Sequence, residues 1–199
     1  MNKEIQLIAK EIDIINKILK NLLINILPSF NITDEKILPY GLKAHTRSVS
    51  WLVEQVITQQ LKYNAKKLNI NDVDINIPDT CLHDCIIIAD KIKYYVNIKI
   101  HNINGKENKN DIAALEKLFT QYTANIEYRL IYACFGIKFD NINISFDKTA
   151  LHLFSPQFLP IYVNPRNDKI QALYKHKPIE RTRKEFLELL KSESKSIIL

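Results

Sequence analysis

The sequence contains little cysteine, and its cysteines have no pattern that would indicate a metal site or a disulfide framework. Cys81, Cys85 and Cys134 are the three cysteines among 199 residues. They are odd in number, and no Cys/His group has the spacing of a zinc site. Cys85 and Cys134 lie within apolar runs, where cysteine usually behaves as a small buried hydrophobe. We therefore expect reduced thiols in a cytoplasmic setting.

The sequence also lacks an uncharged apolar run long enough to cross a membrane. Residues 5–27 are rich in Ile and Leu, but they include Lys10, Glu11, Asp13, Lys17 and Lys20. A spanning helix or a signal peptide would not tolerate these charges. The apolar residues recur at helical spacing over about residues 2–26, and Pro28 ends the pattern. We predict an amphipathic helix without a targeting role, whose apolar stripe packs either on its own domain or against a second subunit.

Length and composition indicate one globular domain. The chain has 199 residues, of which 46% are hydrophobic, which is enough for a sizeable core. A net charge of +6 and a pI of about 9.1 permit a polyanionic partner without requiring one. No internal repeat or linker divides the chain. We expect a single domain over residues 1–199, in which residues 1–38 form an N-terminal helical extension and about 40–190 the core.

Hydrophobic periodicity predicts alternating helices and strands. Helices are expected over about 46–67, 111–123 and 182–191, with Asp111 placed to favour the start of the second. An apolar run at 128–137 predicts a strand buried on both faces. Shorter extended segments are expected at residues 73–77, 143–146, 151–154, 158–163 (extended or helical) and 169–174. This order favours an α/β fold with a mixed β-sheet flanked by helices.

The most informative stretch is residues 84–99, which predicts two strands joined by a tight turn at residues 90–91. Asp84 opens the first strand. Asn97 and Lys99 share one face of the second strand, because side chains alternate between the two faces. Antiparallel pairing of the strands would bring Asp84 close to Asn97 and Lys99.

An acid and a lysine on one strand face suit the hydrolysis of a phosphodiester. Mg²⁺ neutralises charge on the phosphoryl oxygens and is held by a few carboxylates together with water and phosphate. A lysine near the ion can orient or deprotonate the attacking water and offset the developing negative charge. Asp84 and Lys99 match these parts, so the hairpin is a candidate Mg²⁺ site.

The hairpin resembles the core of the PD-(D/E)xK nucleases, in which an acid opens one strand and an acid-x-Lys motif lies on the next. The helix holding Glu54 resembles the helix before that core. Several segments are similar to a group of type II restriction endonucleases: residues 44–55, 96–99, 109–112, 160–167 and 177–186. The resemblance covers roughly residues 40–190. It implies a restriction-endonuclease-like core and a prokaryotic, Mg²⁺-dependent type II restriction endonuclease that makes double-strand cuts at a specific DNA sequence.

The resemblance also implies a role for each site residue. Asp84 would be the bridging metal ligand, Lys99 the catalytic lysine, and Glu54 an auxiliary metal ligand or water-positioning acid. Asn97 stands where the family has its second acid. Its amide oxygen can bind a hard cation without contributing charge, so metal affinity should be lower. Asp79, in a literal Pro-Asp pair, is the rival of Asp84 for the first acid, and Asp84 is favoured because an apolar strand starts directly after it.

DNA binding would need basic and polar side chains outside the hairpin, for contacts to phosphates and to base edges. The candidates are His45, Arg47, Lys106, Lys109, Asn110, Arg166, Lys169, Lys175, His176, Arg181 and Arg183. Asn110 and Asp111 would approach phosphate at the start of the helix predicted at 111–123, with an ordinary helix cap as the alternative. A palindromic target would call for a homodimer, and a cognate DNA methyltransferase would protect the host DNA.

Other interpretations of these residues stay open. The chain could instead be a PD-(D/E)xK-type nuclease of DNA repair or Holliday junction cleavage. It could also be a catalytically inactive DNA-binding protein, which Asn97 in place of an acid would allow. In the simplest structural alternative, Lys99 protects a strand edge and Asp84 caps a turn.

Overall fold

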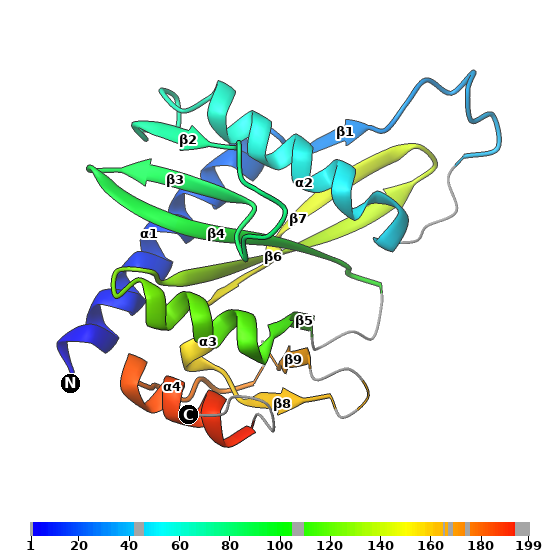
Figure 1. Ribbon diagram of the computed structural model, residues 1–199. Coiled ribbons are helices and arrows are strands. Elements are labelled where there is room, and N and C mark those ends of the chain that lie inside the picture. The colour runs from blue at the N-terminus through cyan, green and yellow to red at the C-terminus, as the bar shows by residue number, and fades with distance from the viewer. Residues whose placement is uncertain are drawn as a thin grey trace.

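The chain forms two β-sheets with helices packed against them (Figure 1). The computed structural model describes residues 2–41, 46–104, 110–164, 166, 169–173 and 176–193. The helices are α1 (Lys3–Asn25), α2 (Thr46–Tyr63), α3 (Leu115–Ala124) and α4 (Arg183–Glu193), with a 3₁₀ turn η1 (Pro156–Phe158). The strands are β1 (Ser29–Asn31), β2 (Asp72–Asp74), β3 (Cys85–Ala89), β4 (Ile92–Asn102), β5 (Asn110–Ala114), β6 (Leu130–Asp140), β7 (Asn143–Phe154), β8 (Ile161–Val163) and β9 (Lys169–Ala172).

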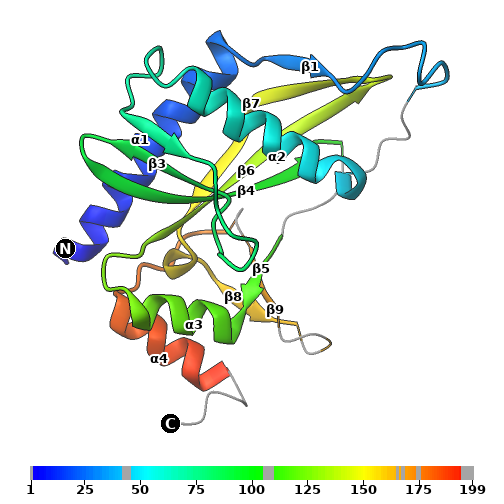
Figure 2. The same cartoon turned by 45° about the horizontal axis from the view of Figure 1, so that its top comes forward.

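The larger sheet is mixed and has helices on both faces. Its strand order is β1-β7-β6-β4-β3-β2, with β4 and β6 parallel and the other pairs antiparallel. Apolar residues of α1 and α2 pack on one face, and those of α3 and α4 pack on the other. Figures 1 and 2 show α3, α4 and the second sheet, β5-β9-β8, grouped together below the large sheet. The α/β class with a mixed sheet flanked by helices is confirmed.

Helix α1 is part of the core. The Asn2 side chain accepts a hydrogen bond from the Glu4 backbone N–H at 2.9 Å and so caps the helix. Ile15, Leu19 and Leu22 are fully buried in the cluster that includes β4 and β6. The apolar stripe therefore packs on the chain's own domain, the first of the two alternatives that the sequence left open.

The hairpin of β3 and β4 forms as the sequence predicts. Asp90 and Lys91 have φ angles of 50° and 65°, the left-handed conformation that two-residue hairpin turns of type I′ require. Cys85 pairs with Val96 at the start of β3. Val96 and Ile98 lie in the core beneath α1 and α2, so Asn97 and Lys99 face the side of α3 and α4.

Strand β6 lies in the middle of the molecule, next to β4. Its first eight residues are all buried, which confirms the prediction of a strand covered on both faces. In the parallel pairing, Asn97 of β4 lies beside Tyr132 and Lys99 beside Cys134. Cys85 and Cys134 are buried, and the three cysteines form no disulfide.

Two predictions about chain segments are wrong. The helix expected from Asp111 begins only at Leu115, because residues 110–114 form β5 and pair with β9. Asn110 and Asp111 therefore lie in a strand and not at a helix N-terminus. The two strands expected at 143–146 and 151–154 are one strand, β7, which stays paired with β6 across an irregularity at Phe135/Gly136.

Three elements end earlier in the chain than the sequence predicts, and strand β1 is an additional element. Helix α2 ends at Tyr63, β2 at Asp74 and β9 at Ala172. Strand β1 follows Pro28 and pairs with β7. Within the described part of the chain, no helix combines the length and the apolar character needed to span a membrane.

Candidate functional site

Asp84 lies where β4 extends beyond its partner strand. The backbone N–H of Asp84 donates to the Val96 carbonyl at 2.9 Å, which is the last step of the β3–β4 pairing. The Ile98 backbone N–H donates to Asp84 Oδ2 at 2.6 Å. The carboxylate thus takes the place of a neighbouring strand along this edge of β4, and its position is fixed by the backbone.

Asn97 lies on β4 beside this carboxylate and is 7% exposed. Its Nδ2 donates to the Leu82 carbonyl oxygen at 2.8 Å. Because that carbonyl can only accept, the amide nitrogen must face Leu82 and Oδ1 must face elsewhere. Oδ1 is buried and has no hydrogen-bond partner among the described residues. An unsatisfied buried acceptor costs ~1–3 kcal/mol, and a bound cation would satisfy it.

Lys99 lies two residues further along β4 on the same face and is partly buried. Its Nζ is 6.0 Å from the centroid of the Tyr132 ring. The positive charge of Lys99 acts on both Asp84 and Glu54, since it lowers the pKa of each carboxyl. Lys99 therefore lies close enough to both acids to act on them electrostatically.

Glu54 reaches the same place from helix α2. Burial, and then the negative charge of Asp84, raise the pKa of Glu54 to about 7, against the opposing effect of Lys99. Burial also raises the pKa of Asp84, against Lys99 and the Ile98 N–H. The helix thus adds a second, electrostatically coupled carboxylate to the edge of β4, and a cation between the two would offset their repulsion and desolvation.

The potential metal donors at the edge of β4 are oxygen atoms. Among the described residues, no three His, Cys, Asp or Glu side chains lie close enough together to hold a metal. The available donors are the carboxylates of Glu54 and Asp84 and the unsatisfied Oδ1 of Asn97. An all-oxygen set with few protein ligands is what Mg²⁺ accepts, because it retains several waters.

Asp79 lies apart from this geometry. It is exposed in the turn before Asp84, where the Cys81 N–H donates to the Pro78 carbonyl. The charged groups that shift the pKa values of Glu54 and Asp84 are Asp84 and Lys99. The structure thus brings Asp84, and not its rival, next to Asn97 and Lys99.

The candidate DNA contacts are distributed over several elements. Arg47 lies in the first turn of α2 and Asn110 at the start of β5. Arg166, Lys169 and His176 are exposed. The remaining candidates His45, Lys106, Lys109 and Lys175 lie outside the described residues.

Arg181 and Arg183 make structural contacts. Arg181 donates to the carbonyls of Gln157 and Leu159, at 3.3 and 2.8 Å. Arg183 donates to the carbonyls of Tyr122 and Tyr128, at 2.6 and 2.5 Å. These guanidinium groups tie α4 and the segment before it to the core, which a sequence count of basic residues does not reveal.

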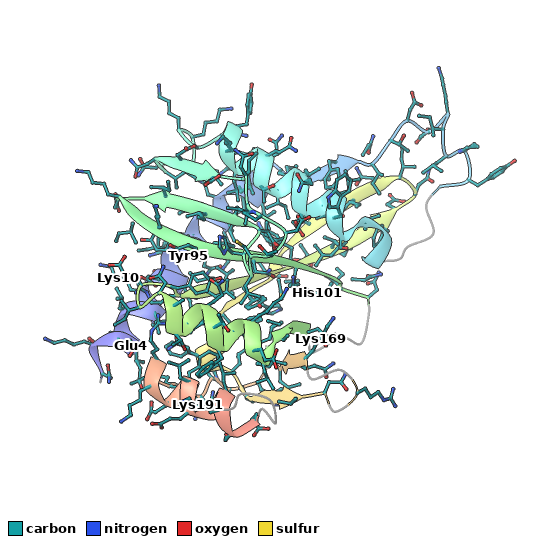
Figure 3. All side chains as sticks on the ribbon, in the orientation of Figure 1. Glu4, Lys10, Tyr95, His101, Lys169 and Lys191 are labelled. Atoms are coloured by element: carbon teal, nitrogen blue, oxygen red, sulfur yellow. The ribbon has the colours of Figure 1, made fainter. Side chains whose placement is uncertain are left out.

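Three groups near the site were not identified from the sequence. The Leu82 carbonyl orients Asn97, and Tyr132 lies beside Lys99 and donates its hydroxyl to the Ile112 carbonyl at 2.5 Å. His101 follows Lys99 two residues further along β4 (Figure 3) and is buried. Its ring centroid lies 5.8 Å from that of His152. The alternation of side chains along β4 places His101 on the same face as Asn97 and Lys99, so the sequence contains a signal for it. The positions of the Leu82 carbonyl and of Tyr132 beside the site depend on the tertiary fold.

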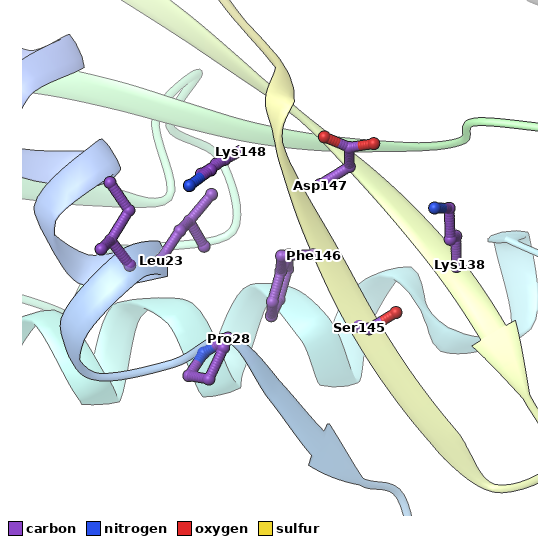
Figure 4. Close-up of a pocket in the computed structure, with 8 residues that line it drawn as sticks. Leu23, Pro28, Lys138, Ser145, Phe146, Asp147 and Lys148 are labelled. Atoms are coloured by element: carbon purple, nitrogen blue, oxygen red, sulfur yellow. The ribbon is translucent and has the colours of Figure 1, made fainter.

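A separate cavity lies between the C-terminal end of α1, Pro28 and β7 (Figure 4). Its volume is about 330 Å³, and it is lined by Leu23, Ile24, Pro28, Lys138, Ser145, Phe146, Asp147 and Lys148. It contains one carboxylate and two lysines but no pair of acids. The residues proposed for chemistry do not line this cavity, so the candidate site is the edge of β4.

Comparison with known proteins supports the fold. No protein-family model matches the sequence, and no curated protein matches it either. Among solved structures, the chain is similar to the NlaIV restriction endonuclease, with a TM-score of 0.57 and 14% sequence identity over 88% of this chain and 77% of that chain. At this identity the similarity shows a restriction-endonuclease-like fold, as the sequence predicted.

Proposed function

We propose that this chain is a Mg²⁺-dependent type II restriction endonuclease that hydrolyses phosphodiester bonds in both strands of DNA at a specific sequence. The observation that carries the proposal is the placement of Asp84 against the edge of β4 that contains Asn97 and Lys99, with Glu54 electrostatically coupled to Asp84 and Lys99. The buried, unsatisfied Oδ1 of Asn97 adds a further oxygen donor on the same strand. The fold shared with a restriction endonuclease supports DNA as the substrate.

Each residue has a distinct part in the proposed reaction. Asp84, Glu54 and Asn97 Oδ1 would hold Mg²⁺, which when bound neutralises charge on the phosphoryl oxygens. The Ile98 N–H keeps the Asp84 carboxylate at the edge of β4, and Leu82 keeps Oδ1 turned away from its own carbonyl. Lys99 orients the attacking water and offsets the negative charge that develops on the phosphate.

Such a reaction needs DNA, a second subunit and a protecting methyltransferase as partners. Exposed basic residues, Arg166 and Lys169 among them, would contact DNA phosphates. A homodimer would place one active site on each strand of a palindromic target. In a prokaryotic cytoplasm, a cognate DNA methyltransferase would protect the host DNA from cleavage.

The direct test uses unmethylated plasmid DNA incubated with the purified chain in Mg²⁺ or in EDTA. Discrete fragments that form only with Mg²⁺ support a restriction endonuclease. Cuts confined to branched DNA would instead indicate a junction-cleaving nuclease. DNA that is bound but never cut, with Mg²⁺ or any other divalent metal, would contradict nuclease activity and leave a DNA-binding protein.

Replacing Asn97 with aspartate is expected to weaken the metal-free fold and strengthen the response to Mg²⁺. The new carboxylate cannot donate to the Leu82 carbonyl, so the free energy of unfolding in EDTA should fall by ~1–3 kcal/mol. In Mg²⁺ the added charge should give Asn97→Asp a larger rise in Tm than the wild type shows. Thermal unfolding with and without Mg²⁺ measures both effects.

Asn102→Asp provides the matched control, because it adds the same charge at the end of the same strand. Asn102 Oδ1 accepts from the Asn104 N–H at 3.0 Å, a turn that aspartate also forms. If Asn97→Asp and Asn102→Asp respond to Mg²⁺ equally, Asn97 is not a metal ligand.

The raised pKa of Glu54 predicts how the metal-free fold responds to pH. The folded-state pKa is about 7 and the ordinary value is 4.5, so between these values the folded chain binds more protons than the unfolded chain. The Glu54 contribution to the free energy of unfolding should therefore rise as pH falls through 7, and level off below 4.5. Urea unfolding in EDTA from about pH 5 to about pH 8 should show this slope reduced in Glu54→Gln. Equal slopes in the two proteins would refute the raised pKa.

A further inference from the structure

Trp51 is the one tryptophan of the chain, and its side chain is 71% exposed on helix α2. The side of α2 that packs on the core contains Val49, Val53, Ile57 and Leu61, all of them buried. Trp51 projects from the other side of the helix, two residues and about 200° from Val53. The indole therefore contributes little to packing in this chain and is available for contact with another molecule.

The position of Trp51 relates it to the candidate site. Residues three apart on a helix are neighbours, with Cβ atoms ~5–6 Å from each other, and Trp51 precedes Glu54 by three residues. Glu54 is the residue of α2 whose carboxyl is coupled to Asp84 and Lys99. Trp51 thus precedes the acid by about one helical turn, and its indole is exposed.

We propose that Trp51 contacts the DNA strand being cut, with its indole packed against the sugar and base next to the scissile phosphate. This inference rests on the proposed nuclease function and adds to it a residue that binds substrate. The net charge of +6 suits a polyanion, and α2 is the helix whose Glu54 is electrostatically coupled to Asp84 and Lys99, where the phosphate would bind. A flat apolar ring can pack on any base or deoxyribose, so this contact supplies affinity and position more than sequence choice.

Tyr63 offers a matched control on the same helix. It is also aromatic and is 86% exposed. It follows Glu54 by nine residues, which places it ~13 Å along the helix and on the opposite side. A general effect of exposed aromatic residues on solubility or association would involve Tyr63 as much as Trp51, whereas a contact beside the site would involve Trp51 alone.

The first measurement uses the intrinsic fluorescence of Trp51, which reports on this residue without labelling. Sheared unmethylated plasmid DNA is added to the wild-type chain in EDTA, while gel shift follows binding independently. A changed emission intensity or a blue shift that saturates together with the gel shift is expected. DNA that is bound without any change in Trp51 emission would overturn the inference and leave the proposed function intact.

The second measurement is cleavage kinetics in Mg²⁺. Trp51→Ala should raise KM about 5- to 150-fold with a much smaller change in kcat, Trp51→Phe should restore much of the affinity, and Tyr63→Ala should match the wild type. An unchanged KM in Trp51→Ala would overturn the contact. If the wild-type chain neither binds nor cuts DNA, the proposed function fails as well.

A contact between subunits would give a different pattern. Trp51 emission would then change with protein concentration in the absence of DNA, and Trp51→Ala would shift the sedimentation of the protein toward the monomer. That pattern would overturn the DNA contact. Emission and sedimentation that are independent of protein concentration, together with the DNA-induced change, support it.

Discussion

Lys99→Ala is expected to abolish measurable DNA cleavage and to leave DNA binding nearly unchanged. In the proposed reaction, Lys99 orients water and offsets charge on the phosphate, and groups of this kind contribute ~10²–10⁴-fold to the rate. Lys99 is partly exposed, and its contact with the Tyr132 ring is long, at 6.0 Å. Its removal should therefore leave the fold intact. Initial cleavage rates in Mg²⁺ and gel shifts in EDTA measure the two properties separately.

Lys93→Ala is the control for that experiment. Lys93 lies on the same strand and the same face as Lys99, but it is exposed near the hairpin turn, ~20 Å away along β4. Both variants lose one positive charge, so a general electrostatic effect on DNA binding would appear in both. A fully active Lys99→Ala protein would eliminate the lysine assignment, and equal losses in both variants would attribute the effect to net charge.

The hairpin could be predicted because the interactions that form it are local. Asp90 and Lys91 tolerate the turn conformation, the flanking residues favour strands, and two-residue alternation places Asn97 and Lys99 on one face. The approach of Asp84 follows from the same pairing. For this reason the part of the site on β3 and β4 was accessible from the sequence.

The rest of the site depends on how the elements pack. The pKa of Glu54 rises because the packing of α2 on the large sheet buries this carboxyl near Asp84. The orientation of Asn97 depends on the Leu82 carbonyl in a loop. The sequence predicts a helix start at Asp111, whereas the structure pairs this residue with Gln171, 60 residues away in the chain. Propensity describes neighbours in the chain, and it cannot detect a strand that exists only through such a distant pairing.

Asn97 has a structural reason to be an amide. An aspartate at this position would direct an oxygen at the Leu82 carbonyl, whereas the amide donates to that carbonyl and still offers Oδ1 to a cation. The negative charge that the position lacks is available from Glu54, which α2 brings to the same edge. The departure from the acid-x-Lys pattern is therefore compatible with the proposed Mg²⁺ site.

Arg129→Ala is expected to destabilise the fold strongly, although it lies away from the site. Arg129 binds Glu11 of α1 through two parallel hydrogen bonds, Nε to Oε2 at 2.8 Å and a terminal guanidinium nitrogen to Oε1 at 2.7 Å. The Glu11 side chain is only 5% exposed. Removal of Arg129 leaves this carboxylate buried without its cation, which typically lowers the free energy of unfolding by ~3–5 kcal/mol. Urea unfolding at neutral pH measures the loss.

Two further variants separate the ion pair from a general effect of truncation. Lys17→Ala breaks an exposed pair with Asp13 on the same helix, where the side chains are 74% and 56% exposed, and should change stability by ~0.5 kcal/mol or less. The apolar double variant Glu11→Leu/Arg129→Met should recover much of the loss, because no charge is then left buried.

The comparison of Arg129→Ala with Lys17→Ala decides whether the ion pair anchors α1 to the residue that precedes β6. If Arg129→Ala loses no more stability than Lys17→Ala, the ion pair does not anchor α1 there, and the Ile and Leu side chains of the helix hold it alone.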